Sequence, residues 1–164
     1  MYERIVLVSR RTRLDELIER FNTKNQARFY IERNGGDFDL YQREHDKQMK
    51  ALEFLRKDLN LGLKLLQCEV NLLPTLLFTE KDLFVTVGRD GLVANTAKYV
   101  DGKAIIAINP DPESIDGILL PFSVEQCSGA VKKVIRGEAK FREITLARVE
   151  LNDGQTRLAC TGRR

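Results

Sequence analysis

The stretch that decides the fold is residues 82–109, DLFVTVGRDGLVANTAKYVDGKAIIAIN. Leu83–Val87 is a short run rich in β-forming residues, and Ala104–Ile108 is a second, almost wholly apolar run. Leu92–Tyr99, between them, is expected to form a helix. Continuous apolar runs are typical of strands that are buried on both faces. The stretch therefore predicts two parallel strands joined through a helix, the basic unit of an α/β fold.

The same order of elements opens the chain. Arg4–Ser9 is another continuous apolar run, and Thr12, three residues before Asp15, is a candidate helix N-cap. Apolar residues then recur at i, i+3, i+4 and i+7, namely Leu14, Leu17, Ile18 and Phe21. This spacing predicts an amphipathic helix after the first strand.

Three further segments connect the two units. Asn22–Asp37 is polar and contains a turn signal at Asn34-Gly35-Gly36. Phe38–Asn60 is long, highly charged and free of Pro and Gly, which predicts a helix whose charges mostly face solvent. Leu63–Cys68 is expected to be a strand. The whole order predicts a Rossmann-like α/β domain, a parallel sheet with helices on both faces.

The pattern changes near the C-terminus. Ser123–Arg136 is expected to be a helix, whereas Asn152-Asp153-Gly154 is a strong hairpin turn between two β-rich runs. A hairpin after a series of strand–helix units indicates a switch to antiparallel structure. We therefore assign residues 1–138 to an α/β domain and residues 139–164 to the first β-hairpin of an incomplete, antiparallel second domain.

Composition excludes several classes of protein. The 164 residues carry a net charge of +3, with −2 on residues 1–128 and +5 on residues 129–164. The basic excess lacks aromatic residues for base stacking, so nucleic-acid binding is not expected. No apolar run is long enough for a membrane helix, and no signal peptide is evident. Three cysteines without metal-ligand spacing favour a reducing compartment, and we expect a cytoplasmic protein without a membrane partner.

The loop Gly88–Gly91 is the segment best suited to chemistry. Ligands of open α/β sheets bind at the carboxyl ends of strands, where glycines let the backbone approach a phosphate. A carboxylate such as Asp90 can accept a proton from a hydroxyl or help to hold Mg²⁺. The alternative is a tight turn in which Asp90 caps the following helix, and these four residues alone favour that alternative.

Two motifs resemble one known family. Val87–Leu92, after an apolar strand, is similar to the Gly-Gly-Asp-Gly-Thr loop of the NAD kinases and their diacylglycerol-kinase-like relatives. Ile106–Ser114 is similar to the Gly-Val-Asn-Thr-Asp-Pro-Glu-Arg-Ser stretch of the mitochondrial-type branch. Asp116–Pro121 falls where that branch has a glycine, apolar residues and a proline. The resemblance is sharp over Asp82–Phe122 and architectural elsewhere.

The resemblance implies ATP-dependent phosphorylation of the 2′-hydroxyl on the adenosine ribose of NAD, which gives NADP. It implies ATP and Mg²⁺ as cofactors and small nucleotides as partners. It also implies that Asp90 activates that hydroxyl, either as a base or through the metal. The implied nucleotide-binding residues, all in the α/β domain, are Gly88, Arg89, Gly91, Asn95, Asn109 and Asp111.

The chain departs from the family pattern in three ways. Arg89 replaces the second glycine of the loop, and its guanidinium can bind phosphate directly. Leu92 replaces the threonine. The β-rich second domain of the family, with its Asn-Glu motif, is represented only by a hairpin that ends at Thr161-Gly162-Arg163-Arg164. We therefore expect either a truncated kinase or a chain completed by a partner, and association into a homo-oligomer is plausible.

Two other functions stay open. One is a non-catalytic nucleotide-binding or regulatory homologue, in which Arg89 and Leu92 mark the loss of transfer chemistry. The other is a related kinase that acts on a lipid or sugar hydroxyl.

Other polar residues have less specific interpretations. The cluster Arg10–Arg13 reaches the same sheet edge as Asp90, where it either attracts phosphate or is a solvated helix start. His45 is expected at the surface of a charged helix. Cys68 and Cys127 are expected in the core.

Overall fold

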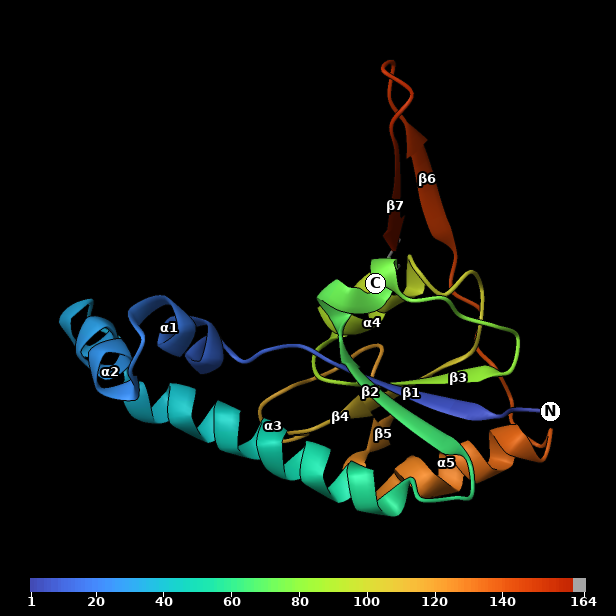
Figure 1. Cartoon of the computed structure of the whole chain (residues 1–164), viewed down its shortest axis with the longest axis horizontal. Helices are drawn as coiled ribbons and strands as arrows, with labels where there is room; N and C mark the ends of the chain where they lie inside the picture. Colours follow the sequence, from blue (N-terminus) through green and yellow to red (C-terminus); the bar gives the residue numbers. More distant parts are fainter. Residues whose placement is uncertain (161–164) are drawn as a thin grey trace.

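Five parallel strands form one sheet in the order β2-β1-β3-β4-β5 (Figure 1). The figure draws a computed structural model of the chain, which describes residues 1–160. The strands are β1 (Arg4–Ser9), β2 (Lys64–Glu69), β3 (Asp82–Val87), β4 (Ile105–Asn109) and β5 (Phe122–Ser123). Every residue of β3 is buried, as a continuous apolar run predicts. The predicted α/β fold is therefore confirmed.

Helices cover both faces of the sheet. After β1 come α1 (Arg13–Phe21), α2 (Lys24–Arg33) and α3 (Phe38–Asp58); α4 (Asp90–Ala97) and α5 (Cys127–Ile135) follow β3 and β5, and the 3-10 turns are η1 (Val70–Thr75) and η2 (Val124–Gln126). On one face α3 and α5 bury Leu55 and Val131 against the strands. On the other, η1 and α4 pack around Phe84.

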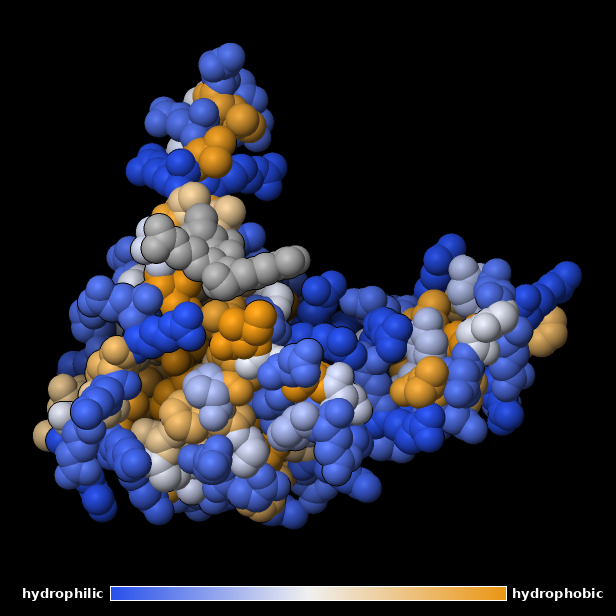
Figure 2. Space-filling model, turned by 180° about the vertical axis from the view of Figure 1, so that it is seen from behind, coloured by the Kyte–Doolittle hydropathy of each residue, from blue (hydrophilic) through white to orange (hydrophobic). Residues whose placement is uncertain are grey.

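The amino-terminal part of α3 extends beyond the sheet and carries α1 and α2, an assembly that we call the helical arm (residues 13–48). Its own small core is formed by Leu14, Ala27, Ile31 and Phe38. The surface of the arm is mostly hydrophilic, and it projects clear of the body of the molecule (Figure 2). One long helix, α3, therefore joins the arm to the sheet.

One α-helix and one strand were not predicted from the sequence. Helix α2 lies in the segment interpreted as polar and turn-containing, because it buries only Ala27 and Ile31, too few positions for a helical pattern. Its N-cap is Thr23, whose hydroxyl accepts from the Gln26 backbone N–H at 3.2 Å. The edge strand β5 has two residues, and so short a strand leaves no periodic signal.

The predicted C-terminal hairpin is confirmed as a separate two-stranded antiparallel sheet. It pairs β6 (Leu146–Glu150) with β7 (Thr156–Cys160) around the expected turn and stands away from the parallel sheet (Figure 1). Residues 161–164, the end of the predicted second domain, lie outside the described residues. Among the helices of residues 1–160, none combines the length and the apolar character needed to cross a membrane.

Candidate phosphate-binding cleft

The order of the strands creates a natural opening beside β1. Strand β2 pairs with one edge of β1 and β3 with the other, so the connections leaving β1 and β3 diverge. In open α/β sheets such a switch point leaves a crevice at the carboxyl ends of the strands, where ligands bind. The residues at this place are Arg10–Thr12 after β1 and Gly88–Arg89 after β3.

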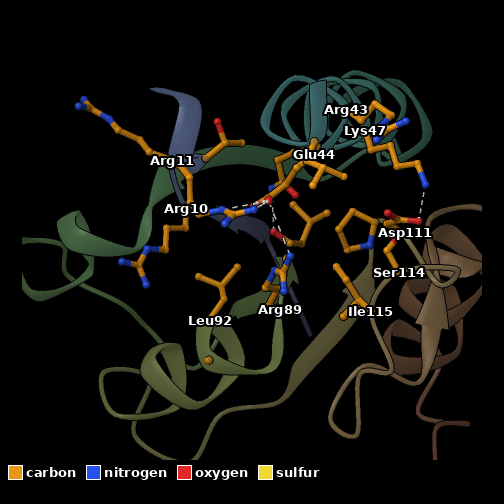
Figure 3. A pocket seen from close by; sticks show the side chains of 18 of the residues that line it. Arg10, Arg11, Arg43, Glu44, Lys47, Arg89, Leu92, Asp111, Ser114 and Ile115 are labelled. Atoms are coloured by element: carbon orange, nitrogen blue, oxygen red, sulfur yellow. Dashed lines mark hydrogen bonds and ion pairs between the residues drawn. The ribbon is translucent and has the colours of Figure 1, made fainter. Parts of the chain in front are cut away.

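A cleft of about 760 Å³ opens at this edge (Figure 3). Its walls are the loops that follow β1, β3 and β4, together with parts of α1, α3 and α4. The structure therefore brings Arg10–Arg13 and the glycine-containing loop after β3 to one site, although the two segments are more than seventy residues apart in the sequence.

Cationic side chains outnumber carboxylates around the cleft. The cations are Arg10, Arg11, Arg13, Arg43, Lys47 and Arg89, and the carboxylates are Glu16, Glu44 and Asp111. Guanidinium groups present paired N–H donors that match the oxygens of a phosphate. The composition of the walls thus suits an anionic ligand with several oxygens.

One carboxylate oxygen connects two arginines from opposite walls. Arg13 Nε, on α1, donates to Glu44 Oε2 at 3.1 Å, and its Nη2 contacts the same oxygen. Arg89 Nη2 lies 3.8 Å from that oxygen on the other side. Figure 3 shows Glu44 reaching from α3 towards Arg89 across the cleft. The Arg13 guanidinium also stacks 4.4 Å from the ring centre of Tyr41.

A second ion pair crosses the cleft with the charges reversed. Lys47 Nζ, on α3, donates to Asp111 Oδ1 at 2.6 Å, and this bond raises the pKa of Lys47. Burial alone would raise the pKa of Asp111, but the bonds from Lys47 and Ser114 outweigh it and lower the value. Nearby, the buried Gln48 amide donates to the Val87 carbonyl at 3.0 Å. Helix α3 is therefore fixed to the ends of β3 and β4.

Asp90 faces away from the two arginines and binds backbone. Its Oδ1 accepts from the Leu119 N–H at 2.8 Å, and its Oδ2 accepts from the Ile118 N–H at 3.2 Å. Asp90 is also the first residue of α4, where its negative charge interacts favourably with the helix dipole. The carboxylate thus ties the β3–α4 loop to the segment after β4, and it is absent from the cleft lining.

Asn109 has a similar structural position. Its Nδ2 donates to the Ile115 carbonyl at 2.8 Å, and its Oδ1 accepts from the Asp111 N–H at 3.0 Å. Gly117, at φ +60°, lies so close that a Cβ atom there would be 3.0 Å from Asn109 Nδ2 and 2.8 Å from Leu120. Asn109 therefore shapes the loop that presents Asp111 to the cleft.

The predicted site residues thus divide into two groups. Gly88, Arg89, Gly91 and Asp111 line the cleft, whereas Asp90, Asn95 and Asn109 do not. Asn95 is half-buried in α4, one turn beyond Asp90.

The contribution of α3 was missed by sequence reasoning. Glu44, Lys47 and Gln48 are spaced i, i+3 and i+4, which places them on one helix face, directed at the strand ends. That spacing was visible in the sequence, but a charged face is most often solvated. His45 also differs from expectation, because it is half-buried with Nδ1 3.0 Å from the hydroxyl of Thr12, the N-cap of α1.

No group of three or more His, Cys, Asp or Glu side chains within residues 1–160 is arranged to hold a metal ion. Mg²⁺ commonly takes one or two protein carboxylates and completes its shell with phosphate oxygens and water. Magnesium at this cleft would therefore fit only as a companion of a phosphate ligand, with Asp111, in the loop after β4, as the protein carboxylate that holds it.

No protein-family model matches the chain, and no curated protein matches it in sequence.

Proposed function

We propose that the chain binds a nucleotide by its phosphate groups in the cleft at the β1/β3 switch point. The observation that carries the proposal is the set of six cationic side chains that line the cleft from α1, α3 and two strand-end loops. The resemblance of Val87–Leu92 and Ile106–Ser114 to the NAD kinases makes ATP and NAD the first ligands to test.

Arg89 supports binding of phosphate through side chains. Where the NAD kinase loop has a glycine, this chain has an exposed arginine whose guanidinium reaches into the cleft. Charge-assisted hydrogen bonds from guanidinium to phosphate are about twice as strong as neutral ones. We infer that the substitution exchanges backbone recognition of the phosphate for recognition by Arg89.

The position of Asp90 favours binding over phosphoryl transfer. A general base must lie within hydrogen-bonding reach of the hydroxyl that it deprotonates. Both oxygens of Asp90 accept backbone N–H groups behind the cleft wall. A non-catalytic nucleotide-binding role is therefore our first proposal, and NAD kinase-like transfer of a phosphoryl group to the ribose 2′-hydroxyl is the second.

A pair of glycine variants tests the location of the site. Gly91 lines the cleft, and a Cβ atom built on it meets nothing within 4 Å, so Gly91→Leu would place a bulky side chain at the cleft without a clash at its Cβ. Gly129, in α5, has the same open surroundings away from the cleft and provides the control Gly129→Leu. Calorimetric titration with ATP, NAD and NADP should show binding to the wild type and to Gly129→Leu, and at least tenfold weaker binding to Gly91→Leu.

A turnover assay with ATP, NAD and Mg²⁺ on the same samples separates the two functions. Binding without formation of NADP would support the non-catalytic role. Formation of NADP that is lost in Asp90→Asn, with stability retained, would support transfer. Equal affinities in the two leucine variants, or no binding of any nucleotide, would refute the proposed site.

A further inference from the structure

The Glu44 carboxylate lies between two arginines of the cleft. Its Oε2 contacts Arg13 from α1 and faces Arg89 from the β3–α4 loop. These two guanidiniums come from different elements and have no other ion-pair partner in the described part of the chain. A phosphoryl oxygen that bridged them would need the place that Glu44 Oε2 occupies (Figure 3).

We infer that Glu44 is an internal competitor for the phosphate ligand and thereby determines which phosphate ligands the cleft accepts. This inference rests on the proposed phosphate-binding function. A ligand that bridges Arg13 and Arg89 must displace the carboxylate, because two anions at one point repel each other. Glu44 therefore lowers the affinity for every phosphate that uses Arg89.

The competition acts most strongly against ligands with one phosphoryl group. Arg43 lines the same cleft on α3 and makes no ion pair among residues 1–160. A ligand with a second phosphoryl group can use the other cationic side chains of the cleft while the first group competes for Arg89, whereas a single phosphate has only the contested place. The class of ligand selected is therefore one with two linked phosphoryl groups, such as a nucleoside diphosphate, a triphosphate or a dinucleotide.

Three variants separate the position of the carboxylate from its charge. Glu44→Gln removes the charge at the bridging point. Glu16→Gln is the matched control, because Glu16 also lines the cleft but only approaches Arg10 at 3.9 Å through exposed side chains. Glu44→Asp keeps the charge and withdraws the carboxylate by one methylene. Each variant would be titrated with inorganic pyrophosphate and with inorganic phosphate, after circular dichroism has shown that it is folded.

Glu44→Gln is expected to bind pyrophosphate about tenfold more tightly than the wild type, and Glu44→Asp about threefold more tightly. Glu16→Gln should change the affinity by less than twofold. The ratio of the affinity for pyrophosphate to the affinity for phosphate should be smaller in Glu44→Gln than in the wild type, because a single phosphate gains most from the free Arg89.

Several outcomes would overturn the inference. An equal gain in Glu44→Gln and Glu16→Gln would show that only overall charge matters. Unchanged or weaker binding in Glu44→Gln, with wild-type binding that Gly91→Leu abolishes, would refute the role of Glu44 and leave the proposed function intact. Absence of pyrophosphate binding in every variant would refute both.

Discussion

The parallel sheet and the cleft at its edge are built from different kinds of side chain. Along β1 and β3 the side chains are mostly apolar and almost wholly buried, and the apolar ones pack against other strands and helices. Around the cleft the charged side chains are at least partly exposed, and several of them pair with residues from distant parts of the chain. One region derives its stability from burial, and the other keeps charge available to solvent.

This difference separates the effects expected from substitutions. Loss of a buried side chain should lower the free energy of unfolding and leave the affinity of the folded molecule unchanged. Loss of an exposed cation at the cleft should lower the affinity for phosphate and leave the free energy of unfolding almost unchanged, because exposed ion pairs contribute little to stability. Residues between the sheet and the cleft, Asp90 above all, test whether effects on stability and effects on affinity are separate.

The largest effect is expected for Leu55→Ala. Leu55 lies in α3 and is fully buried against the sheet, so its truncation should lower the free energy of unfolding by about 3 kcal/mol. Leu40→Ala, at a half-exposed position of the same helix that lines the cleft, should change it by less than about 0.5 kcal/mol. Urea denaturation measures both, and similar losses would contradict the division.

The next effect depends on pH and involves Asp82. Burial would raise the pKa of Asp82, but hydrogen bonds from Arg4 (2.6 and 2.8 Å) and from the Thr79 N–H (2.7 Å) outweigh it and lower the pKa. The folded state therefore binds this proton less readily than the unfolded state. Stability from Asp82 is present above the unfolded pKa of about 3.9 and is lost as the pH falls through the folded value.

Asp82→Asn should accordingly lower the free energy of unfolding by about 2 kcal/mol at pH 7, and the difference from wild type should shrink as the pH falls through the lowered pKa of Asp82. Glu3→Gln is the control, because the exposed Glu3–Lys81 pair joins the same region and should contribute less than about 0.5 kcal/mol at any pH. A difference between wild type and Asp82→Asn that stays constant with pH would contradict this assignment.

A smaller loss of stability is expected for Asp90→Ala. Removal of its carboxylate leaves the Ile118 and Leu119 N–H groups without their acceptor and should lower the free energy of unfolding by about 1.5 kcal/mol. Asp116→Ala, at an exposed position of the loop that contains Ile118 and Leu119, should leave the free energy of unfolding unchanged. Thermal unfolding with circular dichroism tests this. An unaltered melting temperature together with lost NADP formation would show that Asp90 has a functional role and not a structural one.

The smallest effect on stability is expected for Arg43→Ala. Because Arg43 is exposed and forms no ion pair among residues 1–160, its loss should change the free energy of unfolding by less than about 0.5 kcal/mol. The affinity for ATP should fall about fivefold, since one phosphate contact disappears. A clear loss of stability with unchanged affinity would place Arg43 in the structural group instead.

The sequence predicted the sheet well, because its evidence is local. The apolar runs of β1 and β3 and the capping box of Thr12 and Asp15 are readable within a few residues, and the structure has them at the expected positions. Helix α2 was not predicted, because it is stabilised by packing against α1 and α3 and its own sequence has only a weak amphipathic pattern.

The cleft was predictable only in part, because its geometry depends on long-range contacts. The loop Gly88–Gly91 indicated the correct sheet edge, yet neighbouring residues of that loop have opposite roles, with Arg89 facing the cleft and Asp90 facing Ile118 and Leu119. Nothing local in the sequence distinguishes the two directions. Glu44 and Lys47 enter the site only because α3 crosses the strand ends, which is a property of the whole fold.

Titration of Arg89→Ala with ATP tests most directly the claim that the cleft binds phosphate. Arg136→Ala, which removes another exposed arginine beyond the end of α5, has the same net charge and serves as the control. We expect the dissociation constant of ATP to rise about tenfold in Arg89→Ala and less than twofold in Arg136→Ala, with melting temperatures equal to that of the wild type. The same affinity in the two variants would contradict the claim, because binding would then reflect overall charge and not the cleft.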